Sequence, residues 1–180
     1  MEVPSTNTPE QERHPERHAL DLTQYSDQQI LELNAIYCAE FDVRNTAGDT
    51  WAADSFEFLK DALRQLLADD PDRAKRLLTA MVVDKTSIHR ELAATWAPYF
   101  AHVDSKLASW ALYNLDLDED EMVGEAASGA MATFEKLATA EQARSLGDRI
   151  QRAIQGDDPD GYHPGEPYPI QSEPRRDDDS

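Results

Sequence analysis

The stretch LDEDEMVGEAASGAMATF, residues 117–134, joins a run of carboxylates to a helical segment made largely of small side chains. A shift of 34 residues superimposes its apolar positions on those of two earlier stretches. The coinciding residues are Phe58, Leu59, Ala62 and Leu66, then Leu92, Ala93, Trp96 and Phe100, then Ala126, Ala127, Ala130 and Phe134. A period of roughly 20–50 residues is typical of stacked helical repeats.

The shorter segments between these stretches keep the same offset. Asp70, Ala74, Leu77, Leu78 and Met81 match Asp104, Ala108, Ala111, Leu112 and Leu115, and a one-residue slip then gives Ala143, Leu146 and Ile150. Amphipathic helices of equal length would partly superimpose by chance. Because two kinds of segment share one offset, the pattern favours a solenoid of helix pairs.

Local signals also predict helices and give almost no indication of strands. Ser26 and Gln29 form a capping box before a helix with Ile30, Leu33, Ile36 and Tyr37 on one face. A second helix is expected at about 51–68, and Asp70 with Pro71 begins a third. The sequence therefore predicts an all-α domain over residues 23–154, a short right-handed α-α superhelix of about seven helices.

Small side chains in the stretch suggest close contact between helices. Ala126, Ala127, Ser128, Gly129 and Ala130 would allow both neighbouring layers to approach to about 8 Å, the short end of usual interaxial distances. Such packing would offset the roughly 1 kcal/mol that a helical glycine costs relative to alanine.

Two motifs resemble the core of HEAT repeats. Val123-Gly124-Glu125-Ala126-Ala127 follows an Asp-rich turn, and Arg90-Glu91-Leu92-Ala93-Ala94 follows Asp84. The resemblance covers about residues 50–154 and implies a scaffold for macromolecular partners. It also implies that Asp84 and Arg90 belong to a ladder between neighbouring repeats, which Gly124 interrupts because it replaces the second arginine. Tetratricopeptide repeats share the period, but their sequence pattern is absent.

The charge of the chain argues against nucleic acid and anionic membranes as partners. Its 36 acidic and 17 basic residues give a net charge of -19. Binding to phosphate backbones depends on Lys and Arg. The balance instead favours a protein partner with a basic surface. The oligomeric state is left open.

Both ends are expected to be disordered and acidic. Residues 1–22 and 155–180 are polar and rich in proline. An alternative interpretation is that the segment HPGEPYP, residues 163–169, docks as an extended ligand. No apolar run is long enough to cross a bilayer, and the single Cys38 reads as a helical core residue, so a cytoplasmic location is expected. The excess of Arg over Lys hints at a bacterial source.

Each catalytic or metal-binding motif suggested by the sequence lacks residues that it requires or lies in a predicted tail. Asp116, Asp118 and Asp120 imitate the start of a calcium loop, but Glu121 and Ala127 occupy positions that require Gly and Glu. His14 and His18 lie in the predicted tail. His89-Arg90-Glu91 lacks the cysteines of a zinc deaminase site. We therefore expect no catalytic residue, no metal site and no cofactor.

Two features are candidates for partner binding. From Leu107 to Glu135 the chain has no Lys or Arg, while carboxylates recur. The predicted docking patch consists of Asp116, Asp118, Glu119, Asp120, Glu121 and Glu125, with an ordinary solvated face as the alternative. Trp110 and Tyr113 fall where the preceding repeat has Arg76 and Thr79, so they are expected on a wetter face as interface anchors. Burial against the N-terminal helix or a tail is the alternative.

These features predict a non-enzymatic protein-binding module, an adaptor or scaffold that uses an acidic helical surface. The first alternative is an acidic inhibitor or immunity protein that binds a basic protein or mimics nucleic acid. An enzyme of unrecognised class is the least favoured reading.

Overall fold

The chain is all-helical across the residues that the computed structural model describes, which are 20–46, 51–157 and 168. Seven α-helices and no strand occur in this part of the chain, which confirms the predicted all-α class and number of helices. The α-helices are α1 (Asp27–Thr46), α2 (Trp51–Asp69), α3 (Pro71–Val82), α4 (Ser87–Trp96), α5 (Ser105–Asp116), α6 (Glu121–Leu137) and α7 (Ala140–Ile154). Two 3-10 helices are η1 (Leu22–Gln24) and η2 (Ala97–His102).

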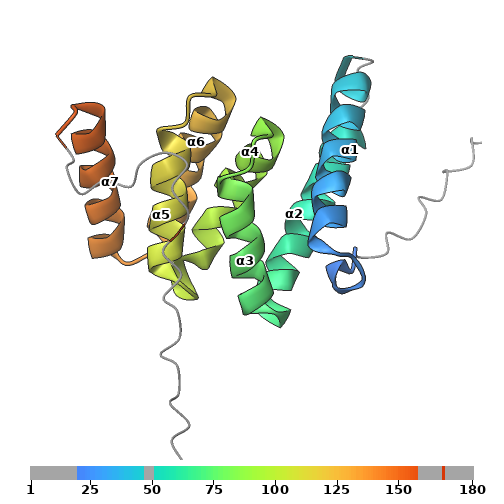
Figure 1. Cartoon of the computed structure of the whole chain (residues 1–180), viewed down its shortest axis with the longest axis horizontal. Helices are drawn as coiled ribbons and strands as arrows, with labels where there is room; N and C mark the ends of the chain where they lie inside the picture. The colour runs from blue at the N-terminus through green and yellow to red at the C-terminus, as the bar shows by residue number, and fades with distance from the viewer. Residues whose placement is uncertain (1–19, 47–50, 158–167, 169–180) are drawn as a thin grey trace, which may run out of the picture.

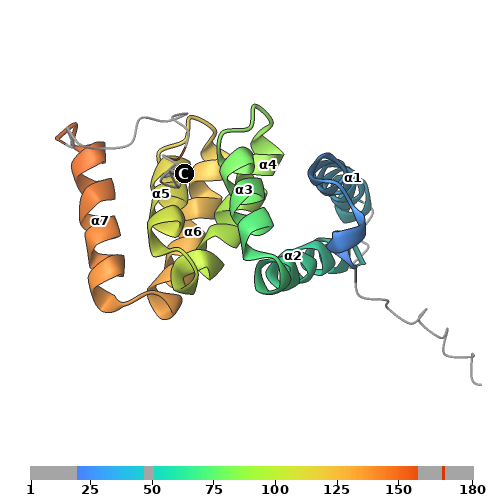
Figure 2. The ribbon, with the colours of Figure 1, turned by 60° about the horizontal axis from the view of Figure 1, so that its bottom comes forward.

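The helices lie side by side along an elongated molecule, from α1 at one end to α7 at the other (Figures 1 and 2). After α1, they form two rows. The first row is α2, α4 with η2, and α6; the second row is α3, α5 and α7. Within the first row α4 packs closely on α6 and only lightly on α2, and within the second row α5 touches both α3 and α7. One continuous apolar core joins the rows.

Hydrogen bonds recur with the period seen in the sequence. The carboxylate of Asp70 accepts from the backbone N–H of Arg73 at 3.0 Å, and Asp104 accepts from Leu107 at 3.0 Å. Each aspartate caps the N-terminus of a second-row helix, satisfying a donor that the helix leaves unpaired. Thr139 caps α7 in the same way, one residue later than a strict period requires. The predicted one-residue slip is therefore present in the capping bonds.

Pro98 ends the α-helical part of the middle segment in the first row. Proline has no backbone N–H to donate to the carbonyl four residues before it and its ring crowds that turn. The α-helical segment accordingly ends at Trp96 and continues as η2. This tighter segment still buries Phe100 completely, so the repeat's apolar position is kept.

The N-terminal part is fastened to the core by polar contacts. The predicted capping box forms, since Ser26 Oγ accepts from the backbone N–H of Gln29 and the Gln29 side chain accepts from the backbone N–H of Ser26. Asn34 is fully buried in α1 and donates to the carbonyl of Ile88 at 3.0 Å. Arg73 of α3 bonds to Asp27 and to the carbonyls of Leu22 and Tyr25. These bonds hold α1 against α3 and α4.

One expected core position is exposed. Ile30 is fully buried as predicted, but the side chain of Ile36 is 53% exposed. The two residues are six apart, which places them on different sides of a helix with 3.6 residues per turn. Helix α1 therefore buries a narrower stripe than its apolar residues suggest.

The small side chains of α6 serve two different purposes. Ala127 is fully buried and permits close packing. A Cβ added to Gly124 would meet the backbone oxygen of Asp116 at 3.5 Å, an ordinary contact, whereas one added to Gly129 would meet nothing within 4 Å. The expectation that the whole stretch is closely packed on both sides is thus wrong at Gly129, because that side of α6 faces open space.

The predicted tails fall mostly outside the described residues. The same is true of His14 and His18. At the inner edge of the predicted N-terminal tail, Leu22 is buried. From the predicted C-terminal tail, Tyr168 packs against the core. No helix in the described part of the chain is long and apolar enough to cross a membrane.

Candidate functional site

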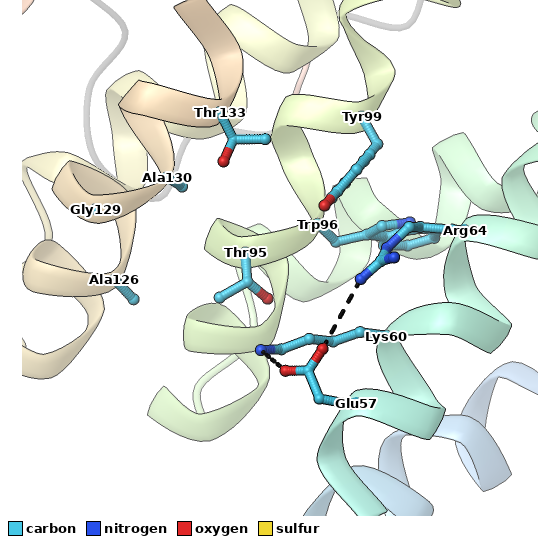
Figure 3. Close-up of a pocket in the computed structure, with 10 residues that line it drawn as sticks. All are labelled: Glu57, Lys60, Arg64, Thr95, Trp96, Tyr99, Ala126, Gly129, Ala130 and Thr133. Carbon is cyan, nitrogen blue, oxygen red and sulfur yellow. Dashed lines mark hydrogen bonds and ion pairs between the residues drawn. The ribbon is translucent and has the colours of Figure 1, made fainter. Parts of the chain in front are cut away.

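A groove lies on the first row, between α2, α4 with η2, and α6 (Figure 3). It has a volume of about 290 Å³ and opens to solvent. Helix α2 contributes Glu57, Lys60 and Arg64, and the middle segment contributes Thr95, Trp96 and Tyr99. The α6 side consists of Ala126, Gly129, Ala130 and Thr133. These four α6 residues are spaced i, i+3, i+4, i+7, so they form a single stripe along one helix face.

Small side chains create this groove. Gly129 has no side chain, and a Cβ there would project into empty space. Ala126 and Ala130 extend only one carbon from the backbone, so α6 leaves room that larger residues would fill. The sequence analysis identified the small residues 126–130 but interpreted them as a packing surface. It missed Lys60, Arg64 and Tyr99, whose chemistry becomes visible only when three separate helices are brought together.

Charged side chains form one wall of the groove. Lys60 Nζ lies 2.9 Å from Glu57 Oε1, and Arg64 Nη1 lies 2.7 Å from Asp61 Oδ1. The guanidinium carbon of Arg64 lies 4.9 Å from the centroid of the Tyr99 ring, a cation–π distance. The side chain of Glu57 is 58% exposed. This wall therefore offers both signs of charge beside an aromatic face.

Trp96 supplies the buried part of the groove wall. It is only 2% exposed and stands edge-on to Phe100, with ring centroids 4.9 Å apart. Its indole Nε1–H has no hydrogen-bond acceptor among the described residues. A buried donor without a partner is uncommon, because it loses hydration without compensation.

Arg90 connects two turns of the first row. Its guanidinium donates to both carboxylate oxygens of Asp118, at 2.7 and 3.0 Å, and to the carbonyl oxygen of Asp84 at 2.8 Å. Asp84 and Asp118 are 34 residues apart and each accepts from the backbone N–H two residues later. The contact with Asp118 raises the pKa of Arg90, so the guanidinium stays charged.

Hydrogen bonds also fix the carboxylate of Asp84. Burial raises its pKa, but the hydrogen bond from the backbone N–H of Thr86 and the nearby His89 imidazole outweigh that effect, and the pKa lies below its usual value. His89 Nδ1 lies 3.2 Å from Asp84 Oδ1. In the motif His89-Arg90-Glu91, His89 and Arg90 therefore contact the turns at Asp84 and Asp118 and do not form an open site.

The predicted acidic patch is divided by the structure. Asp118 is held by Arg90 and its side chain is only 11% exposed. Asp120 caps α6 by accepting from the backbone N–H of Met122, and Asp116 accepts from Ser128 Oγ at 2.6 Å. Three carboxylates, Glu119, Glu121 and Glu125, are exposed. The docking assignment therefore does not suit Asp118, because its carboxylate already neutralises a buried guanidinium.

The exposed carboxylates lie close in sequence to an exposed apolar side chain. Met122 is 60% exposed at the start of α6. The part of the patch that a partner can reach consists of Glu119, Glu121, Met122 and Glu125, which we call the α6 acidic turn.

Trp110 and Tyr113 do not lie on a wet face. Trp110 is fully buried and Tyr113 is 3% exposed, so the expectation of exposed anchors is wrong and the alternative of burial applies. The Tyr168 ring covers Trp110 with centroids 5.3 Å apart, and the Arg149 guanidinium carbon lies 5.1 Å from the Tyr113 centroid. Contacts from later segments explain why position in the repeat alone misplaced these residues.

The described residues include no group of three or more His, Cys, Asp or Glu side chains placed to hold a metal ion. Comparison of the chain with models of known protein families, with curated proteins and with solved structures found no match.

Proposed function

We propose that the chain is a protein-binding module, an adaptor or scaffold of HEAT-like helix pairs in a short right-handed superhelix, and that it binds a partner segment along the first-row groove. The observation that carries this proposal is the groove itself, where small α6 residues face the Trp96 and Tyr99 side chains. The recurring caps and the Arg90 link between turns 34 residues apart support the HEAT-like assignment. The proposal assigns no catalytic role.

A protein segment suits the groove better than a small molecule. Small-molecule sites usually enclose about 300–1,000 Å³ and bury most of the ligand. This groove has about 290 Å³ and is open along one side. A partner helix or extended strand would cover it lengthwise, and the absence of bulk at Gly129 lets the partner backbone approach closely.

The charge of the first row favours a partner segment with basic residues. Glu57 and Asp61 are exposed on α2, and Glu121, Glu125 and Glu135 are exposed on α6. These carboxylates outnumber the cations Lys60, Arg64 and Lys136 on the same helices, although the groove lining itself holds Lys60 and Arg64 against Glu57 alone, so the basic residues of the partner would lie outside the groove. Complementary charge raises association rates and discourages acidic partners.

The proposal is tested with a matched pair of substitutions on α6. Gly129→Leu places a side chain in the groove, and Ala132→Leu places the same side chain at an exposed position of the same helix outside the groove lining. Tagged wild type and both variants are used for quantitative affinity purification from cells of the native source. A protein retained by wild type and Ala132→Leu but lost with Gly129→Leu is the expected result. Equal recovery with all three would count against groove binding.

An acidic inhibitor of a basic protein is the second candidate. The α6 acidic turn favours it, because its exposed carboxylates flank exposed Met122 in sequence, within a stretch, 107–135, that has no Lys or Arg. An inhibitor would block its partner's activity, and replacement of Glu119, Glu121 and Glu125 with Gln would reduce inhibition in step with affinity. An adaptor would leave the activity of a captured partner unchanged.

A further inference from the structure

The second row carries the opposite charge from the first. Its helices hold more basic than acidic side chains although the whole chain has a net charge of -19. The basic residues are Arg73, Lys75 and Arg76 on α3, Lys106 on α5, and Arg144, Arg149 and Arg152 on α7. The acidic residues are Asp72, Asp116, Glu141 and Asp148. Arg76, Lys106, Arg144 and Arg152 are exposed, against Asp72, Glu141 and Asp148, so the exposed side chains of the three helices have a small excess of positive charge.

An aromatic contact ties the C-terminal part of the chain to this row. The Tyr168 ring lies at 60° to the Trp110 ring of α5, with centroids 5.3 Å apart. Position 110 corresponds to exposed Arg76 in the preceding repeat, yet Trp110 has no exposed surface. Its Nε1–H also has no hydrogen-bond acceptor among the described residues. Trp110 is therefore a buried aromatic at a position where the repeat itself would leave the side chain at the surface.

The residues around Tyr168 in the sequence match the charge of the second row. Residues 155–180 contain Arg175 and Arg176 as their only Lys or Arg, against Asp157, Asp158, Asp160, Glu166, Glu173, Asp177, Asp178 and Asp179. Tyr168 itself stands between Pro167 and Pro169. Prolines restrict the unbound chain, so less conformational entropy is lost when such a segment docks.

We propose that the second row is a docking face for an acidic, proline-flanked tyrosine segment, and that the chain's own C-terminal segment occupies it through Tyr168. The aromatic pair supplies the apolar contact, and the cations of α3, α5 and α7 supply charge complementarity. Because the segment is tethered to α7, its effective concentration is on the order of millimolar, so a weak contact is enough to keep the face occupied. This site is separate from the groove and does not depend on the proposed function.

Self-occupancy has a direct consequence for binding. An external acidic segment with the same chemistry must displace Tyr168 before it reaches Trp110. Removing the tyrosine therefore opens the face, and it does so without altering any residue of the helices.

The test uses the full chain with Tyr168→Ala and, as a matched control, Tyr162→Ala from the same segment. The probe is a fluorescent peptide of residues 158–180, together with the same peptide carrying Tyr168→Ala. We expect the Tyr168→Ala chain to bind the native peptide at least tenfold more tightly than wild type or Tyr162→Ala. The substituted peptide should bind at least tenfold more weakly than the native peptide. Equal binding by all three chains, or no binding to Tyr168→Ala, would overturn the proposal.

Two further measurements distinguish docking of the Tyr168 segment from a general loss of packing in the Tyr168→Ala variant. The indole N–H resonance of Trp110, assigned with Trp110→Phe, should shift in Tyr168→Ala and return toward its wild-type position when native peptide is added. Arg76→Glu combined with Lys106→Glu should weaken peptide binding in the Tyr168→Ala background, and Gly129→Leu should leave it unchanged. A stationary Trp110 resonance, or binding indifferent to the charge reversals, would contradict the assigned face. Loss of peptide binding with Gly129→Leu would place the peptide in the groove instead.

Discussion

Arg90 shows how one side chain connects consecutive turns. It lies in a largely buried position, 13% exposed, and satisfies the Asp118 carboxylate together with the Asp84 carbonyl. The sequence allowed the turn aspartate and the helix arginine to be predicted, because both belong to the motif. It did not identify Asp118 as the partner, although Asp118 is the 34-residue counterpart of Asp84. Its place in an acidic run instead favoured a surface role.

Removing either member of this ion pair should destabilise the protein strongly. Arg90→Met or Asp118→Leu leaves an uncompensated charge in a poorly hydrated position, which should cost about 3 kcal/mol in the free energy of unfolding. The double variant should recover much of that loss. Urea denaturation of the three variants measures the effect, with the exposed neighbour Glu119→Gln as a control expected to change stability by less than about 0.5 kcal/mol. If the single variants match wild type, the link between turns has no stabilising role.

Helix α6 shows why a sequence pattern can fit two different structures. A stripe of small residues suits both a closely packed interface and an open groove, and only the position of the neighbouring helices distinguishes them. The caps of α3 and α5 were predictable, since Asp70 and Asp104 bond to backbone groups only three residues away. The groove was not, because α2, η2 and α6 meet through contacts that are distant in sequence.

Substitutions within α6 should therefore have opposite effects. Gly129→Ala should raise the free energy of unfolding by roughly 1 kcal/mol, because alanine favours helix and its Cβ meets no neighbour. Ala127→Leu should lower it by about 1–3 kcal/mol, since the side chain at this position is fully buried. Chemical denaturation compares the two. A harmless Ala127→Leu, or a destabilising Gly129→Ala, would show that α6 packs differently.

At the scale of the molecule, the two rows carry different charge and different neighbours. The net charge of -19 was known from composition, but its separation between rows depends on which helices pack together. The burial of Trp110 also required the whole fold, because Tyr168 covers it from 58 residues further along the chain. Local periodicity contains no information about such a contact.

Salt should stabilise the protein as a whole. Like charges repel one another in a chain with this net charge, and that repulsion is screened as ionic strength rises. The melting temperature should increase by a few degrees when NaCl is raised from about 0.05 M to about 0.5 M, where the Debye length is only a few ångströms. Far-ultraviolet circular dichroism follows the loss of helix. A fall in melting temperature would mean that exposed ion pairs outweigh the general repulsion.

Site-specific photo-cross-linking tests the central claim, groove binding, most directly. A photoreactive benzoylphenylalanine is placed at exposed Glu57 on the edge of the groove, where it does not fill the space above Gly129, or at Ala132 outside the groove, and each chain is irradiated in extracts of the native source. The account predicts a discrete adduct from position 57 that is absent from position 132 and is outcompeted by untagged wild type. Adducts from position 132 alone, or equal adducts from both positions, would contradict a partner seated between α2, η2 and α6.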